Sequence, residues 1–326
     1  MTRLRNWRKN MWRCLRMADF LTIDGGTTNT RISLVREGAV TDTIKLAVGA
    51  RANMEEPELL KNSIRDGIRQ LLCRNHLEEG DISQILASGM ITCEYGLCNL
   101  PHLVAPAGIA ELRSGMYTVQ FPEICSVPFT FIRGVRLAGN RLENADMMRG
   151  EETELMGLEQ LEKGLYILPG SHSKLIEVDE AARIVSFRTE LTGEMIAALA
   201  EHTILKGSLD LQNAALAEDK LWEGYCYCDT HGLNESLFKV RILKNLFHVT
   251  EDEAYSFFLG AVLHDEIRTI LDAHVPKIVI GGKGQLREPM AYLLRRMTDR
   301  EIVILPEEQV QHLPALGAVK IYTYEK

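Results

Sequence analysis

Several features are scarce or absent in this 326-residue chain. No apolar run approaches the ~20 residues of a membrane-spanning helix, so no helical membrane span is expected. Basic residues form no internal stripe and the formal net charge is −8, which argues against a nucleic-acid binder. The seven cysteines are odd in number and irregularly spaced. That spacing argues against a disulfide framework and favours a reducing cytoplasm.

The remaining composition is typical of a soluble globular protein. Hydrophobic residues make up 46% of the chain and charged residues 25%. A chain of 326 residues is long for one hydrophobic core, which favours two domains. The sequence leaves the oligomeric state open, and a homo-oligomer is compatible with it.

The first seventeen residues differ from the rest of the chain. They carry six basic residues, two tryptophans and no acidic residue, and they lack the apolar core of a secretory signal. A basic amphipathic anchor is one interpretation. We favour an extension outside the fold that is dispensable for activity, with Met17 as the alternative start.

The most informative pattern lies in residues 19–31, where a short apolar run ends in Asp24 and an alternating apolar segment follows the turn. This pattern predicts a strand, a tight turn and a second strand. The turn residues are Gly25, Gly26, Thr27, Thr28 and Asn29. Glycines allow close backbone approach and small polar residues suit phosphate oxygens, while Asp24 suits a hydrated Mg²⁺. An ordinary glycine hairpin explains the same residues.

The pattern of expected elements occurs twice along the chain. The first cycle predicts strands at 20–24, 31–36, 39–46, 83–88 and 129–133, with helices at 56–75 and 146–160 and an excursion at 91–126. The second cycle predicts strands at 165–168, 174–178, 183–187, 277–280 and 301–305, with helices at 193–205, at 252–273, after 282 and from 314. A duplicated domain with a cleft between the copies follows from this repetition.

Each cycle opens with a glycine-containing, hydroxyl-rich turn. The second turn is Gly170-Ser171-His172-Ser173, in the place that Gly25-Gly26-Thr27-Thr28 takes in the first cycle. Two such turns, facing each other, can clamp a polyphosphate. The second turn therefore favours the phosphate interpretation of the first over a plain hairpin.

Several longer strings resemble one family. "MMRGEETELMG" (147–157), "LPGSHSK" (168–174), "FRTELTGE" (187–194), "DGGTTNTR" (24–31) and "HTILKGSL" (202–209) are similar to the 2-dehydro-3-deoxygalactonokinase family, within the superfamily of sugar kinases, actin and heat-shock chaperone ATPases. The resemblance implies an α/β fold with two ribonuclease-H-like domains, at 18–145 and 146–326, and an interdomain nucleotide cleft.

The same resemblance implies a reaction. It is the ATP-dependent phosphorylation of the terminal hydroxyl of 2-dehydro-3-deoxy-D-galactonate to the 6-phosphate, a step of D-galactonate catabolism, with Mg²⁺ neutralising the phosphates. The alternatives are a kinase for a related 2-keto-3-deoxy sugar acid or polyol, and a non-catalytic ATP-binding regulator on the same scaffold.

The resemblance also implies roles for the residues that bind the nucleotide. Asp24 would serve the metal, and the turn from Gly25 to Asn29 would hold phosphate. Gly170, Ser171 and His172 would form the second phosphate hairpin. Gly281 and Gly282, after a strand, would pack against adenosine, although a simple turn explains that glycine pair equally well.

Three residues of the 146–152 segment are candidates for the chemistry. Asp146 is the first choice for the catalytic base, as an Asp near the entry to a helix, although an Asp there is equally a good N-cap. Glu151 is the second choice. Arg149 would bind the substrate carboxylate or a phosphate, and the competing interpretation is an ion pair with Glu152 at helical spacing.

The acceptor site is the least defined. Gly89, Met90 and Glu94 belong to the excursion expected to line it. There the chain reads "ITCEYGLC" (91–98), where family members carry a Ser-Asn or Ser-Arg pair and a Gly-Trp-Lys run. The ATP machinery is therefore better supported than the sugar acid.

A helix start and a lysine complete the candidates. Thr192 and Glu194 open a helix whose free N–H groups could bind a sugar-acid carboxylate, and a plain helix cap is the alternative. Lys174 follows the second hairpin, where it could meet phosphate or lie in solvent.

Overall fold

The computed structural model describes residues 18–56, 58–211 and 213–325. The predicted extension at 1–17 lies outside the described residues. In the ranges that are described, no helix is both long and apolar enough to cross a membrane. The chain divides into two compact units, and each is described by itself. The first comprises Met1–Glu162, Asp179–Ser186 and Gln311–Lys326, and the second comprises Lys163–Val178 and Phe187–Val310.

The first unit is built on a six-stranded sheet with the order β3-β2-β1-β4-β7-β6. The first three strands form an antiparallel meander, and β1, β4 and β7 run parallel. Their bounds are β1 Asp19–Gly25, β2 Thr30–Arg36, β3 Ala39–Leu46, β4 Ile82–Gly89, β6 Tyr117–Val119 and β7 Phe129–Phe131. The expected strands of the first cycle are confirmed, and β6 is an additional one.

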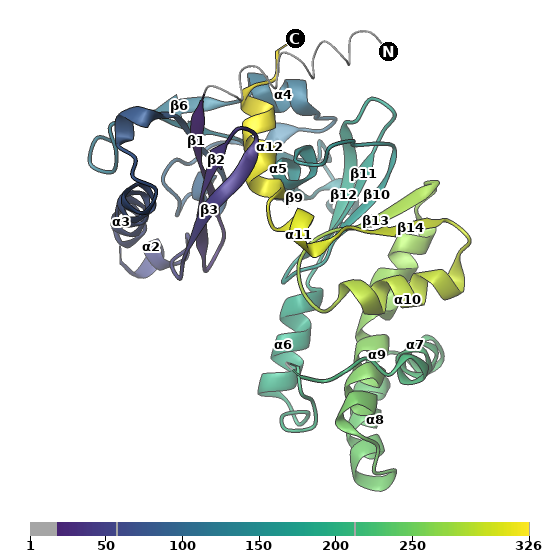
Figure 1. The fold of residues 1–326 in the computed structure, drawn as a ribbon. Coiled ribbons are helices and arrows are strands. Elements are labelled where there is room, and N and C mark those ends of the chain that lie inside the picture. The colour runs from purple at the N-terminus through teal and green to yellow at the C-terminus, as the bar shows by residue number, and fades with distance from the viewer. Residues whose placement is uncertain (1–17, 57, 212, 326) are drawn as a thin grey trace. The chain divides into compact units, whose positions relative to one another are not determined.

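Helices cover both faces of this sheet (Figure 1). On one face, Leu21 and Ile23 of β1 pack in one core with Ile64 and Ile68 of α3 (Leu59–Arg74). On the other face, Thr22 lines a small pocket with Ala315 of α12 (Leu313–Tyr322). Burial on both faces explains why β1 and β4 are almost continuously buried strands rather than alternating ones.

Short elements complete the first unit. A three-stranded sheet has the order β5-β8-β9. The bounds are α2 Ala52–Glu55, β5 Leu103–Val104, α4 Ile109–Ser114, β8 Val135–Arg136, β9 Met147–Met148 and α5 Glu151–Met156, with 3-10 turns η1 Glu79–Asp81, η2 Met90–Thr92 and η3 Leu142–Asn144. The single helix expected at 146–160 is wrong, because 147–148 pair with β8 as a strand before α5 begins.

The first unit extends beyond the boundary expected between residues 145 and 146. Helix α5 packs tightly on α12, and a Cβ at Gly317 would overlap the carbonyl oxygen of Thr153. This close packing, which only glycine permits, places α5 and the C-terminal helix in the first unit.

The second sheet repeats the strand order of the first. Its five strands are arranged β12-β11-β10-β13-β14, with β10 and β11 antiparallel and β10, β13 and β14 parallel. Their bounds are β10 Gly164–Leu168, β11 Ser173–Val178, β12 Ile184–Glu190, β13 Lys277–Ile280 and β14 Glu301–Ile304. The expected duplication of an α/β core is confirmed.

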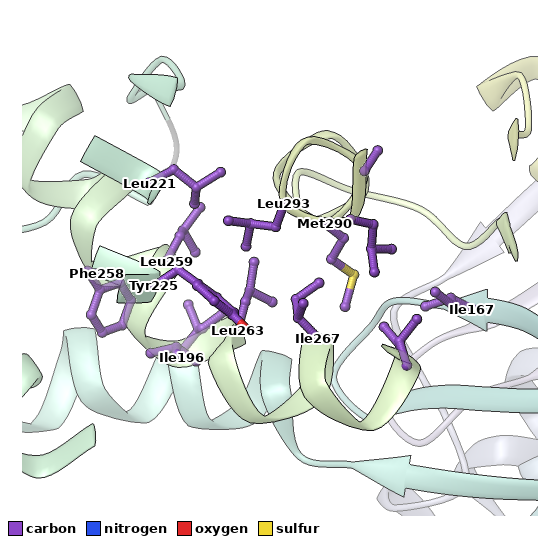
Figure 2. Close-up of a cluster of buried hydrophobic side chains, with 14 of the residues drawn as sticks. Ile167, Ile196, Leu221, Tyr225, Phe258, Leu259, Leu263, Ile267, Met290 and Leu293 are labelled. Carbon is purple, nitrogen blue, oxygen red and sulfur yellow. The ribbon is translucent and has the colours of Figure 1, made fainter. Parts of the chain in front are cut away.

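A group of helices distinguishes the second unit. Their bounds are α6 Thr192–His202, α7 Glu218–His231, α8 Leu233–Leu246, α9 Glu251–Asp272, α10 Arg287–Met297 and α11 Glu307–Val310. Figure 2 shows the core, where Leu263 and Ile267 of α9 lie among side chains of α10, α7 and β10. The helix expected at 252–273 is confirmed, whereas α7 and α8 are not among the sequence predictions.

Candidate active site

The first hairpin turn accepts hydrogen bonds from the segment that follows β3. Within the turn, the N–H of Gly26 donates to the carbonyl oxygen of Asn29 at 2.8 Å. The Gly26 carbonyl accepts from Ala50 N–H at 3.1 Å, and the Thr27 carbonyl accepts from Arg51 N–H at 3.0 Å. The side chains of residues 27–29 are exposed. The turn is thus fixed by its carbonyl groups and presents hydroxyl and amide groups outward.

Asp24 is half-buried at the end of β1 and faces a cation that the sequence analysis did not consider. Its Oδ2 lies 3.5 Å from Nη1 of Arg31, its partner across the hairpin. In the described part of the chain, no group of three or more His, Cys, Asp or Glu side chains could hold a metal ion. One carboxylate suits a Mg²⁺ that takes its other ligands from water and nucleotide phosphates. The residues present fit an ion of that kind.

Three glycines meet beside this turn. Gly25 and Gly89 end the parallel strands β1 and β4 in register. A Cβ at Gly89, where φ is +83°, would overlap the carbonyl oxygen of Gly25, and one at Gly150, where φ is +112°, would lie 3.4 Å from Gly89 Cα. The Arg-Gly-Glu-Glu segment therefore lies against the end of β4, next to the first hairpin turn.

Arg149 is engaged within the first unit in a way that the sequence analysis did not predict. Its Nη1 donates to the carbonyl and hydroxyl oxygens of Thr92 at 2.8 and 2.9 Å, and its Nη2 donates to the carbonyl oxygen of Leu100 at 3.1 Å. Burial lowers the pKa of the guanidinium. These bonds anchor the loop after Gly89. They join the guanidinium to this loop and not to Glu152, and binding of a substrate carboxylate or phosphate by Arg149 stays a prediction.

The adjacent carboxylates of α5 differ in burial. Glu152 is fully buried and accepts from the N–H of Gly150 at 2.9 Å with both oxygens, and from the hydroxyl of Thr153 at 3.1 Å. Burial, and then the neighbouring Glu151, raise the pKa of Glu152 to about 8. Glu151 is only partly buried. Of the two residues, Glu151 is therefore the more accessible.

Asp146 does not have the expected position at a helix start. Helix α5 is capped by Gly150, and Asp146 instead precedes the strand β9. Its Oδ1 accepts from Met147 N–H at 2.6 Å, and its carbonyl oxygen accepts from Leu137 N–H at 2.9 Å. The helical argument for Asp146 is wrong, because pairing with the segment after β8 keeps this stretch extended.

The loop after Gly89, which is expected to line the acceptor site, is compact. Its first turn, Met90–Thr92, is closed by a hydrogen bond from the Thr92 hydroxyl to the Gly89 carbonyl at 2.9 Å. Glu94 is exposed, and a hydrogen bond with it raises the pKa of the Tyr95 hydroxyl. The loop thus presents an acid at its surface, in agreement with the difference noted in the sequence.

The second hairpin turn is held by the start of α6. The Ser171 carbonyl accepts from Glu194 N–H at 3.1 Å, and His172 Nε2 lies 3.2 Å from Glu194 Oε1. A Cβ at Gly193 would overlap the carbonyl oxygen of Gly170. The structure thus brings Gly170, Ser171, His172 and Glu194 together.

The expected adenosine glycines lie beside the same turn. Gly281 N–H donates to the Ile167 carbonyl at 2.8 Å, and a Cβ at Gly282 would lie 2.7 Å from the Pro169 carbonyl oxygen. Gly282 has a φ of +65°, in the left-handed region that favours glycine. The second hairpin turn and the glycine pair therefore lie together at the carboxyl ends of β10 and β13.

Two other sequence candidates point inward. Thr192 is buried, and its hydroxyl donates to Glu266 of α9 rather than capping α6 or facing an anion. Lys174 is also buried, with its Nζ 2.6 Å from the hydroxyl of Thr189, so the solvent-exposed alternative is wrong. Glu266 is not among the residues predicted from the sequence, because no local pattern identifies the partner of a buried hydroxyl.

A family model and two curated proteins that match this chain carry the name of the same kinase. The model of the family 2-keto-3-deoxy-galactonokinase matches residues 24–312. The 2-dehydro-3-deoxygalactonokinase of Escherichia coli (strain K12) is 26% identical over 282 residues, which cover 84% of this chain and 89% of that protein. The "Probable 2-dehydro-3-deoxygalactonokinase DgoK1" of Rhizobium meliloti (strain 1021) is 29% identical over 57% of this chain and 58% of that protein.

A solved structure shares the fold. The Sinorhizobium meliloti protein described as a "putative 2-dehydro-3-deoxygalactonokinase" superposes with a TM-score of 0.76. The match covers 92% of this chain and 97% of that one, at 21% identity. It shows that the architecture of the two units is that of a known fold.

Proposed function

The chain belongs to the 2-keto-3-deoxy-galactonokinase family, and from this premise we propose that it transfers the γ-phosphoryl group of ATP to the terminal hydroxyl of 2-dehydro-3-deoxy-D-galactonate. The products are the 6-phosphate and ADP. The observation that carries this proposal is the meeting of Gly25, Gly89 and Gly150. It brings the first phosphate turn, the acceptor loop and the Arg-Gly-Glu-Glu segment to one place in the first unit.

Phosphoryl transfer depends mainly on holding charge in position. The turn from Gly25 to Asn29 supplies phosphate donors, and Asp24 holds a Mg²⁺ that neutralises the phosphates when bound. The turn Gly170–His172 supplies the second set of phosphate donors, and Gly281 with Gly282 leaves room for adenosine. The interdomain nucleotide cleft stays a prediction.

Glu151 is the better candidate for the base that accepts the proton of the substrate hydroxyl. It follows directly on Gly150, which lies against the end of β4. Asp146 is separated from Gly150 by the strand β9. Glu152 is buried and bonded to Gly150, so it orients the turn rather than accepting the proton.

The acceptor is proposed to lie along the loop from Gly89 to Glu94. Arg149 fixes this loop through Thr92 and Leu100. Exposed Glu94 can accept hydrogen bonds from sugar hydroxyls. It would repel a carboxylate that faced it, which favours a polyol, an acceptor without a carboxylate, as the second candidate.

A coupled assay of ADP release tests the proposal. The protein is incubated with ATP, Mg²⁺ and a panel of 2-keto-3-deoxy sugar acids and polyols, with ATP alone as the control for hydrolysis. The highest kcat/KM is expected with 2-dehydro-3-deoxy-D-galactonate. A higher kcat/KM with a polyol would support the second candidate. ATP binding without acceptor-dependent ADP release would favour a regulator.

A further inference from the structure

A buried acid lies beneath the second hairpin. Glu266 of α9 is 2% exposed, and its neighbours Leu263 and Ile267 on the same helix point into the hydrophobic core shown in Figure 2. Burial raises the pKa of its carboxyl group to about 7. Placing an acid in such surroundings costs free energy unless hydrogen bonds offset the lost hydration.

Glu266 lies next to two segments of the proposed nucleotide site. The hydroxyl of Thr192, the first residue of α6, donates to Glu266 Oε2. Ser173, the residue after His172, lies near the carboxyl group and lowers its pKa, but Ser173 Oγ and Glu266 Oε1 are both buried without a hydrogen-bond partner. Ser173 and Thr192 are themselves buried. The carboxyl group therefore holds the helix start and lies next to the hairpin.

The same two segments also contact each other directly. Glu194 N–H donates to the Ser171 carbonyl at 3.1 Å, and Gly193 packs against the Gly170 carbonyl without room for a Cβ. Such close packing depends on the spacing between the turn and α6. Thr192, the residue before Gly193, is bonded to Glu266 on the interior side.

We propose that Glu266 is a positioning residue for nucleotide phosphates, because its carboxyl group holds Thr192 at the start of α6, and this helix start in turn holds the turn Gly170–His172. This inference rests on the proposed function of that turn. Glu266 does not touch the nucleotide. Its removal should therefore weaken phosphate binding and leave adenosine binding and the acceptor site largely unchanged.

Steady-state kinetics of Glu266→Leu and Glu266→Gln test this proposal. Leucine removes the hydrogen bond to Thr192, and we expect the KM for ATP to rise about tenfold, with kcat and the KM for the sugar acid changed less than about threefold. Glutamine keeps an acceptor oxygen and adds a donor, so it should return the KM for ATP to within about threefold of the original.

Ser256→Ala is the matched control. Ser256 is also buried on α9, where its hydroxyl accepts from Ala217 N–H at 2.8 Å, away from the hairpin. Its loss should leave the KM for ATP unchanged. An equal rise in KM for Ser256→Ala and Glu266→Leu would show a general effect of destabilising α9 and would overturn the proposal.

Calorimetric binding keeps the test independent of catalysis. With the full chain, AMP-PNP and ADP should bind more weakly to Glu266→Leu, while adenosine should bind as before. Thr192→Val, which keeps the side-chain shape, should repeat the effect if Glu266→Leu fails to fold. Equal weakening for adenosine, or a Gln variant as impaired as the Leu variant, contradicts positioning. Failure of the kinase proposal would appear separately, as absent ADP release from the unaltered protein.

Discussion

The two hairpin turns take the same place in two sheets of the same strand order, yet different elements hold them. The first turn is fixed through its carbonyls by residues 49–51 and carries the Asp24–Arg31 ion pair at its base. The second is fixed by the start of α6, whose first residue, Thr192, is bonded to the buried Glu266. Equivalent topology therefore does not imply equivalent chemistry. The first turn offers a carboxylate, whereas the second offers backbone groups and a histidine.

Glu151→Gln is expected to have the largest effect, because it removes the proposed base beside the first turn. General base catalysis contributes typically ~10²–10⁴-fold, so kcat should fall by about that factor while nucleotide affinity stays within about threefold. Asp146→Asn is the matched control and should lower kcat less than about tenfold. Steady-state kinetics and calorimetry with AMP-PNP measure both quantities. The opposite ranking of the two variants would return the base to Asp146.

Asp24→Asn against His172→Gln compares the two turns directly. Loss of the Asp24 carboxylate should lower kcat/KM for ATP about 100-fold and raise the Mg²⁺ concentration needed for half-maximal rate. His172 is exposed and pairs with Glu194, so its replacement should cost less than about tenfold. A Mg²⁺ titration of both variants gives the measurement. Equal losses of kcat/KM would show that both turns contribute equally to stabilising the phosphate charge.

Glycine substitutions test how tightly each turn is packed. Gly89→Ala forces a Cβ onto the Gly25 carbonyl at a φ of +83°, and we expect the free energy of unfolding to fall by roughly 2–4 kcal/mol. Gly170→Ala meets only the His172 carbonyl oxygen at 3.9 Å and should cost less than about 1 kcal/mol. Urea unfolding measures both. A large loss at Gly170 would mean that its backbone tolerates no Cβ.

The pH dependence of stability tests the burial of Glu152. Its pKa is about 8 in the folded protein against a usual 4.5, so between these two pH values the folded protein retains a proton that the unfolded chain has released. The resulting contribution to the free energy of unfolding is fully present below pH 4.5 and is lost as the pH rises through 8. The slope is at most about 1.4 kcal/mol per pH unit. Urea unfolding from pH 5 to 8.5 should show a smaller slope for Glu152→Gln. An unchanged slope would contradict the raised pKa.

The hairpins and the duplicated sheets could be predicted from the sequence, because their signals are local. Apolar runs bounded by glycine turns identify β1, β2, β10 and β11 wherever the chain folds. The ion pair of Asp24 with Arg31 could also have been predicted from the hairpin register, because the two residues are cross-strand partners.

Elements that depend on distant contacts could not be predicted. Residues 147–148 become a strand through pairing with β8. Helix α8 buries only Ser236 and Val240, so its apolar periodicity is weak. The inward direction of Thr192 depends on Glu266, which lies 74 residues away in the chain.

The most direct test of the central claim is phosphorus NMR of the reaction product. The protein is incubated with ATP, Mg²⁺ and 2-dehydro-3-deoxy-D-galactonate, and the spectrum is followed as ADP forms. The account predicts a phosphomonoester resonance coupled to the two protons on C6. Orthophosphate as the only new signal, or an unchanged ATP spectrum, would contradict it.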